Sequence, residues 1–193
     1  MKQFKSLLQN NKLFKSGLAL IAAVCLFMSS FAFLANVYPL AESDVWGGHS
    51  DLSAPVDSDN DGVYEITKGA ELAYIIKNGG SGANYILTKD IYLNDVTKIN
   101  WETGVAEDGY TINSWYGNYE STAFSGSIDG NGHVVYGLYF NVGSSYGNYL
   151  DYTVGLIPEV TGTANISNLG VDKAFINYES YAAAFVGLGR AGT

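Results

Sequence analysis

The sequence SIDGNGHVVYGLYF, residues 127–140, decides the predicted fold because its pattern of apolar and turn residues returns further along the chain. Three short segments around and after this stretch resemble one another: Ala123-Phe124-Ser125-Gly126, Gly155-Leu156-Ile157-Pro158 and Ala184-Phe185-Val186-Gly187. Apolar positions also correspond at a nearly constant offset, and the pairs are Ile128 with Val160, Val134 with Ile166, Leu138 with Leu169, and Phe140 with Val171. Chance similarity in a glycine-rich β protein is the alternative, but the agreement of the four offsets favours a repeat of about 30 residues.

A repeat of this length, with two or three short strands in each unit, is typical of a solenoid. Strands of successive turns would stack in parallel with apolar side chains pointing inward, and glycine and asparagine would occupy the corners. A β-sandwich would instead show hairpin-spaced strands without a phase relation between distant segments. We therefore expect an all-β protein in which residues 63–193 form a parallel β-helix solenoid.

Residues 68–78 are predicted to form one amphipathic helix. The apolar stripe of this helix consists of Leu72, Ile75 and Ile76. Thr67 is a suitable N-cap, and Gly79-Gly80 is a typical helix end. Because the first turn of a solenoid has no neighbour beneath it, its apolar interior and its strand edges would face water. We expect the helix to cap that end.

The first 41 residues have the pattern of a secretory signal peptide. Their basic residues are Lys2, Lys5, Lys12 and Lys15, and an apolar run over residues 18–35 follows. Cleavage after Ala32 fits a small-x-small rule, whereas cleavage after Ala41 would follow a polar stretch but would put Pro39 at the unfavourable −3 position. An uncleaved membrane anchor is the alternative. Residues 42–62 then form a polar leader. The pattern predicts an exported protein.

Composition excludes several classes of function. The chain has 10 Lys and Arg against 19 Asp and Glu, a formal net charge of −9, which argues against a nucleic-acid binder because phosphate contacts need a basic face. Its 2 His and 1 Cys exclude a zinc site built from clusters of those residues. The single cysteine, Cys25, lies in the signal segment, so packing, hydrogen bonds or a metal must hold the exported part together. The negative charge suits divalent cations.

The leader ends in a pattern typical of calcium loops, Asp57-x-Asp59-x-Asp61-Gly62. Alternating carboxylates followed by glycine let the backbone curl around one hard cation, and the carbonyl of Val63 would be the next ligand. Lys68 stands where an EF-hand has its bidentate glutamate, so Glu65 or Glu71 would have to substitute. The expected metal is calcium, with Asp57, Asp59 and Asp61 as ligands, and a solvated acidic turn is the alternative.

Residues that could carry catalysis are few. His49 lies in the leader, and His133 lies at a turn, which favours a surface role. A glycosidase needs two carboxylates at a set spacing, and the sequence singles out no pair among its candidates, which are Asp129, Asp151, Glu159 and Asp172. A polysaccharide lyase would use Lys or Arg on an acidic sugar, and the exported part has few basic residues. We therefore expect no active site in this chain.

Residues 94–122 are polar and lack clear periodicity, and we interpret them as an insertion loop. Aromatic residues stand out in it, and four are candidates for carbohydrate binding: Trp101, Trp115, Tyr116 and Tyr119. Exposed Trp and Tyr faces can stack against sugar rings. The alternative is that these rings fasten the loop to the wall of the solenoid.

The chain resembles the GLUG-type repeat β-helices of bacterial surface proteins. The residues that carry the likeness are SIDGNGHVVYGLYF (127–140), VGLIPEVTGTANISNLGVDKAFI (154–176) and AAAFVG (182–187), with YEITKGAELAYI (64–75) and YILTKDIYLN (85–94) as the cap and first turn. The resemblance implies a right-handed parallel β-helix that is secreted or held on the surface of a bacterium. The sequence stops at Thr193 without a Leu-Pro-x-Thr-Gly motif, so we expect it to be the N-terminal part of a longer protein.

The predicted function is that of an exported, non-catalytic β-helix module for surface attachment or for binding polysaccharide or protein. The expected partners are an extracellular polysaccharide or a protein of a host or cell surface, and a membrane only through an uncleaved signal segment. The alternative is the N-terminal part of a carbohydrate-active enzyme, a lyase or glycosidase, whose catalytic residues lie in further turns or another domain.

Overall fold

The computed structural model describes residues 44–117, 119–141, 152–179 and 181–190. Contacts divide the chain into two compact units, Met1–Pro39 and Leu40–Thr193, and every described residue belongs to the second. The predicted signal segment, residues 1–41, therefore lies outside the described residues. Within the described ranges, no helix has the length and apolar character needed to cross a membrane.

Four short parallel strands form the largest sheet, in the order β1-β2-β6-β10. Their bounds are β1 Val63–Ile66, β2 Asn84–Leu87, β6 Ser127–Asp129 and β10 Asn165–Ser167. The register places Tyr85 beside Ile128 and Ile128 beside Ile166, so these side chains form one row on the inner face. The next position along each strand, Asp129 in β6, faces outward, as the period of two in a strand requires.

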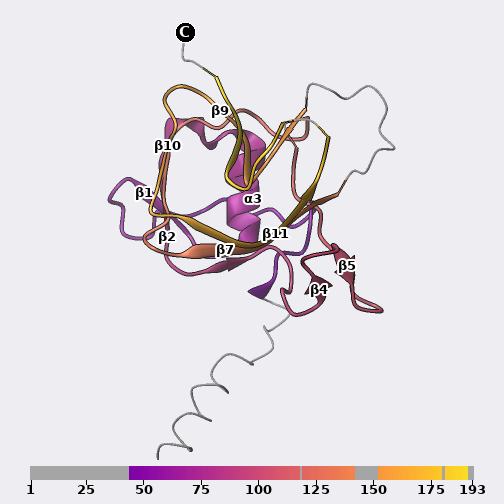
Figure 1. Cartoon of the computed structure of the whole chain (residues 1–193). Helices are drawn as coiled ribbons and strands as arrows, with labels where there is room; N and C mark the ends of the chain where they lie inside the picture. Colours follow the sequence, from indigo (N-terminus) through magenta and orange to yellow (C-terminus); the bar gives the residue numbers. More distant parts are fainter. Residues whose placement is uncertain (1–43, 118, 142–151, 180, 191–193) are drawn as a thin grey trace, which may run out of the picture. The chain divides into compact units, whose positions relative to one another are not determined.

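The remaining strands form smaller sheets. A three-stranded parallel sheet has the order β11-β7-β3, with β3 Ile91–Tyr92, β7 Val134–Asn141 and β11 Gly170–Asn177. Two parallel pairs are β8 Thr153–Val154 with β12 Tyr181–Ala182, and β9 Ile157–Val160 with β13 Val186–Gly189. One antiparallel pair joins β4 Ile99–Asn100 to β5 Val105–Ala106. In the view of Figure 1, helix α3 lies between the strands of the two larger sheets.

The prediction of one parallel β-helix solenoid over residues 63–193 is wrong. The described strands fall into five separate small sheets, one of them antiparallel, joined mostly by loops. The predicted repeat register is wrong too, because Ile128 pairs with Ile166 rather than Val160, and Leu138 pairs with Ala174 rather than Leu169. Short apolar strands can satisfy the same inside–outside pattern in several alignments, so the pattern alone does not select the register.

The predicted helix is confirmed as α3, Gly69–Asn78, and Leu72, Ile75 and Ile76 are buried. Its N-cap is Lys68 rather than Thr67. The Thr67 backbone N–H and hydroxyl instead donate to one carboxylate oxygen of Glu71, at 2.7 and 2.9 Å. The helix ends at Gly79, whose left-handed conformation (φ 77°) lets its N–H donate to the Ile75 carbonyl.

A buried asparagine, Asn94, connects β3 to the middle of β7. Its side-chain amide donates to the carbonyl of Gly137 at 2.8 Å, and its side-chain oxygen accepts from the N–H of Asn113 at 2.8 Å. Gly137 has a φ of 79°, and opposite it Lys173 has a φ of 54°. The register of β7 and β11 skips this pair, which marks a matched irregularity in both strands.

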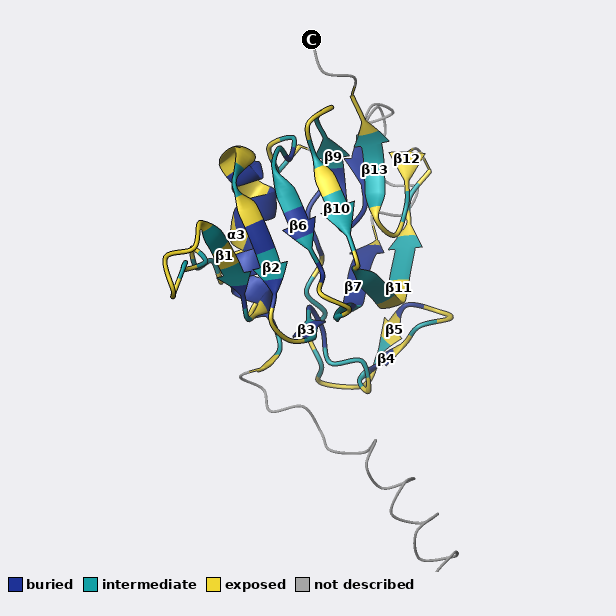
Figure 2. Cartoon of the chain, turned by 90° about the vertical axis from the view of Figure 1, so that its left-hand side faces the viewer, coloured by how far each residue is buried: buried dark blue, intermediate teal, exposed yellow. Residues whose placement is uncertain are grey.

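The last strands of the sheets are less covered than the strands beside them (Figure 2). Ile128 is 1% exposed, whereas its neighbour Ile166 is half-buried. Val135 is fully buried, and its neighbour Val171 is again half-buried. Strands β10, β11, β12 and β13 each have a partner on one side only within the described chain.

Candidate functional site

The acidic turn before β1 brings its three aspartates together. One carboxylate oxygen each from Asp57, Asp59 and Asp61 lie within 4.8 Å of one another. The backbone holds them there: the N–H groups of Asp61 and Gly62 donate to the Asp57 carboxylate at 3.1 and 3.0 Å, and the N–H of Val63 donates to Asp61 at 2.8 Å. This exposed cluster could hold a metal ion.

The two glutamates considered as further metal ligands are engaged elsewhere. Glu65 accepts hydrogen bonds from the hydroxyl and the backbone N–H of Ser58, at 2.8 and 3.0 Å. Those two bonds, the hydroxyl bond foremost, hold the pKa of Glu65 below its usual value. Glu71 is buried and accepts from Thr67. The cluster therefore consists of three aspartates, and a metal ion held there would have to take its further ligands from backbone carbonyls and water.

Two of the four predicted sugar-binding aromatics belong to the core. Trp115 and Tyr116 are each 1% exposed, and the indole N–H of Trp115 donates to the Leu156 carbonyl at 2.8 Å. Trp46 packs edge-on against Trp115, with ring centroids 4.9 Å apart. Their buried faces give a sugar ring no surface, and their packing is the fastening role considered as the alternative.

The other two aromatics remain partly accessible and do not join the first pair. Trp101 is half-buried, and its indole N–H donates to the Val96 carbonyl at 3.0 Å. Tyr119 is 52% exposed, and its ring lies 4.8 Å from that of Tyr152. The structure thus does not gather the four predicted residues into one sugar-binding surface.

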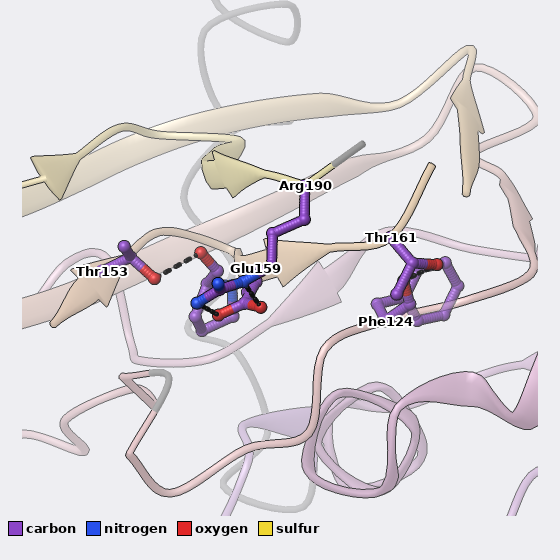
Figure 3. Close-up of polar contacts among 6 residues, drawn as sticks. Phe124, Thr153, Glu159, Thr161 and Arg190 are labelled. Carbon is purple, nitrogen blue, oxygen red and sulfur yellow. Dashed lines mark hydrogen bonds and ion pairs between the residues drawn. The ribbon is translucent and has the colours of Figure 1, made fainter. Parts of the chain in front are cut away.

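The carboxylates considered as glycosidase candidates, where the structure describes them, are each engaged in contacts within the fold. Asp129 accepts from the N–H of Asn131 and the amide of Asn168, and these bonds lower the pKa of Asp129. Glu159 forms an ion pair with Arg190, which joins β9 to the residue after β13 (Figure 3). The same view shows the Thr153 hydroxyl bonded to the Pro158 carbonyl.

The other two candidates are Asp151 and Asp172. Asp172 accepts from the N–H of Lys173 at 2.8 Å. Asp151 lies outside the described residues. The contacts of Asp129, Glu159 and Asp172 are hydrogen bonds and an ion pair with neighbouring groups of the fold, which favours structural roles for them.

Both histidines have defined partners. His49 stacks on Tyr116, with ring centroids 4.4 Å apart, and its Nδ1 lies 3.6 Å from a carboxylate oxygen of Glu120. His133 uses Nδ1 to reach Asp90 at 3.1 Å. Because a carboxylate can only accept, His133 Nδ1 carries the proton in this bond.

A pocket that the sequence did not predict lies around the start of β3. Its volume is about 390 Å³, and its lining includes Lys68, Lys89, Asp90, Tyr92 and His133; we call it the Tyr92 pocket. These residues come from three segments far apart in the sequence. The sequence around each segment has no motif that would predict the pocket. The one sequence signal was the clustering of charge and tyrosine at residues 88–92.

No family model, curated protein or solved structure matches the chain. The resemblance to GLUG-type repeats and the bacterial surface location that it implies remain predictions. The acidic cluster and the Tyr92 pocket are therefore the features from which a function is argued.

Proposed function

We propose that this chain is an exported, non-catalytic binding module that holds a calcium ion in the loop Asp57–Asp61 and attaches to an extracellular polysaccharide or a cell-surface protein. The observation that carries the proposal is the group of three carboxylates within 4.8 Å, held in place by backbone hydrogen bonds. Export is supported by the basic and apolar pattern of residues 1–41.

Calcium is the cation that suits this loop best. Hard oxygen ligands of this kind select Ca²⁺ or Mg²⁺, and Mg²⁺ demands near-ideal octahedral geometry that a loop of alternating aspartates does not impose. Among the residues that the structure describes, three carboxylates are close to one another, and Glu65 and Glu71 are engaged elsewhere. Sites of few carboxylates bind weakly, with a Kd of about 10⁻⁴ to 10⁻³ M, which is the range of extracellular calcium modules.

A non-catalytic role is supported by what the candidate carboxylates contact. Asp129 and Glu159 are taken up by an asparagine pair and by Arg190. A general acid needs a pKa raised toward the working pH, whereas the hydrogen bonds of Asp129 lower its pKa. These contacts weigh against the alternative of a glycosidase within the described part of the chain.

The test is a calcium titration followed by thermal unfolding of the full chain. At ten times the Kd, calcium should add about 1.4 kcal/mol to the free energy of unfolding, a rise in Tm of about 3–6 °C. Asp59→Asn should abolish the rise, because it removes one ligand charge while keeping the size of the side chain. Asp108→Asn, an exposed aspartate of another loop, is the matched control and should retain it.

The proposal of a calcium site is refuted if the parent chain melts at the same temperature in calcium and in chelator. It is also refuted if Asp59→Asn and Asp108→Asn respond to calcium equally. A response to magnesium as large as that to calcium would assign the loop to divalent cations in general and overturn the choice of metal.

A further inference from the structure

The Tyr92 pocket contains polar groups that nothing else in the described chain uses. Lys89 is exposed and has neither a hydrogen bond nor an ion pair there. Lys68 reaches only Glu71, at the long distance of 3.9 Å. His133 forms a hydrogen bond to Asp90 through Nδ1, so its Nε2 can bind a ligand or water. The pocket therefore offers donors and an acceptor together.

Tyr92, which lines this pocket, is one of two stacked tyrosine rings. The rings of Tyr92 in β3 and Tyr136 in β7 stack with centroids 5.0 Å apart and planes 12° apart. The two residues are register partners in the sheet, and both are half-buried. Burial and the neighbouring Asp90 raise the pKa of both phenols, so each keeps its hydroxyl proton at neutral pH. Flat rings of this kind suit the C–H faces of a sugar.

Charge at the pocket is balanced. Lys68 and Lys89 are matched by Asp44 and Asp90 among the lining residues. The Asp90 carboxylate is held in place by the N–H of Val134 at 3.0 Å and by His133 at 3.1 Å. Sugar hydroxyls both donate and accept, so ammonium and carboxylate groups side by side can bind neighbouring hydroxyls. A balanced pocket gives an anionic ligand little net attraction.

A second, larger pocket lacks these free groups. It has a volume of about 470 Å³ and is lined by Lys98 and Tyr110 among others. Lys98 is paired with Glu107 at 2.8 Å, and the Tyr110 hydroxyl contacts the N–H of Asp95 at 2.8 Å. Its lysine and its tyrosine hydroxyl are thus already engaged within the chain, so it is the weaker candidate.

We infer that the Tyr92 pocket binds one sugar unit of an uncharged polysaccharide, with the sugar ring against Tyr92 and its hydroxyls on Lys89, Asp90 and His133. The volume of about 390 Å³ lies within the range of small-molecule sites, about 300–1,000 Å³. This inference rests on the proposed function as a polysaccharide-binding module and names both its site and its ligand class.

The test is affinity electrophoresis of the full chain in native gels that contain dextran, galactomannan, xylan or the acidic polygalacturonate. At least one uncharged polysaccharide should retard the parent chain. Tyr92→Ala and Lys89→Ala should each lower the association constant about tenfold, equivalent to about 1.4 kcal/mol. Tyr92→Phe should recover most of the binding lost in Tyr92→Ala, because the ring remains. Tyr181→Ala, at an exposed tyrosine outside the pocket, is the matched control and should bind as the parent does.

Circular dichroism melting of each variant separates lost binding from lost folding, and Lys89 is exposed, so its removal should leave the fold intact. If the parent is retarded but Tyr92→Ala and Lys89→Ala bind equally well, the pocket is refuted while polysaccharide binding stands. Loss of binding in Trp101→Ala or Tyr119→Ala would then place the polysaccharide site on the loop of residues 94–122. Retardation by polygalacturonate alone, or by none of the polymers, overturns the inference; the calcium titration tests the metal site independently.

Discussion

Replacing Gly137 with alanine should destabilise the protein far more than a glycine substitution at an open turn. Gly137 has a φ of +79°, and a Cβ placed there would lie 2.8 Å from the oxygen and 2.9 Å from the nitrogen of Asn94. These are backbone atoms of a residue that is 0% exposed and held by hydrogen bonds, so they cannot swing aside. The substitution must therefore displace the junction between β3 and β7.

The expected loss follows from these contacts. A left-handed backbone costs an alanine about 1–2 kcal/mol, and overpacking against a fixed neighbour adds about 1–3 kcal/mol. The lower entropy of the unfolded alanine chain offsets about 0.4–1 kcal/mol. The free energy of unfolding should therefore fall by about 1–5 kcal/mol, with a central value of about 3 kcal/mol.

The matched control is Gly132→Ala, because Gly132 has a φ of +81° and nothing within 4 Å of its Cβ position. It should lose about 1 kcal/mol or less. Urea unfolding followed by circular dichroism measures both variants against the parent. Equal losses in the two variants would refute the reasoning, because they would mean that the contact with Asn94 costs nothing.

Two further predictions concern the helix and the acid range. Ile75→Asp should lower the free energy of unfolding by several kcal/mol, about 3–5, because Ile75 is 1% exposed and the aspartate would be an unpaired buried charge; a variant as stable as the parent in urea would show that α3 is not part of the core. The hydrogen bonds from the Asn131 N–H and the Asn168 amide hold the folded-state pKa of Asp129 below its usual value. Its carboxylate therefore contributes stability above that usual pKa and loses the contribution as pH falls through the folded pKa. The Tm of the parent between pH 5 and pH 2 should thus fall more steeply than that of Asp129→Asn, and parallel curves would contradict this assignment.

The helix was predictable because its signals are local. The stripe of Leu72, Ile75 and Ile76 needs only the period of an α-helix, and Gly79 ends the helix through its own backbone conformation. The acidic turn was predictable for the same reason, since Asp57 accepts from residues four and five positions later. A motif whose contacts all join residues a few positions apart can be predicted from the local sequence.

The sheets were not predictable in this way, because their register depends on pairings between distant residues. Val160 and Ile166 are both apolar and both suit a partner for Ile128, and only the folded chain selects Ile166. The irregularity at Gly137 and Lys173 also shifts the alternation within a single strand pair. The solenoid prediction depended on a constant sequence spacing between paired apolar residues. The observed strand pairing does not keep such a spacing.

The accessibility of the aromatic residues in the loop of residues 94–122 also depends on contacts with distant residues, so the sequence did not predict it. Trp115 stands among polar neighbours in the sequence, yet its partners are Trp46 and the Leu156 carbonyl, from distant segments. Likewise, His133 and Asp90 meet at the Tyr92 pocket although neither stands in a recognisable motif. Polarity of the flanking residues therefore did not indicate which rings are accessible.

Strands β10 to β13 are half-exposed, so we expect them to open locally at a lower free energy than the segments around α3. Amide protons in β12 and β13 are shielded by fewer apolar contacts than those of α3, so they should exchange with solvent through small local openings. Strands β10 to β13 could then separate under mild denaturant or mechanical load before the segments around α3 open. The Asp57–Asp61 loop and the Tyr92 pocket lie outside strands β10 to β13, so we expect binding there to persist when these strands separate.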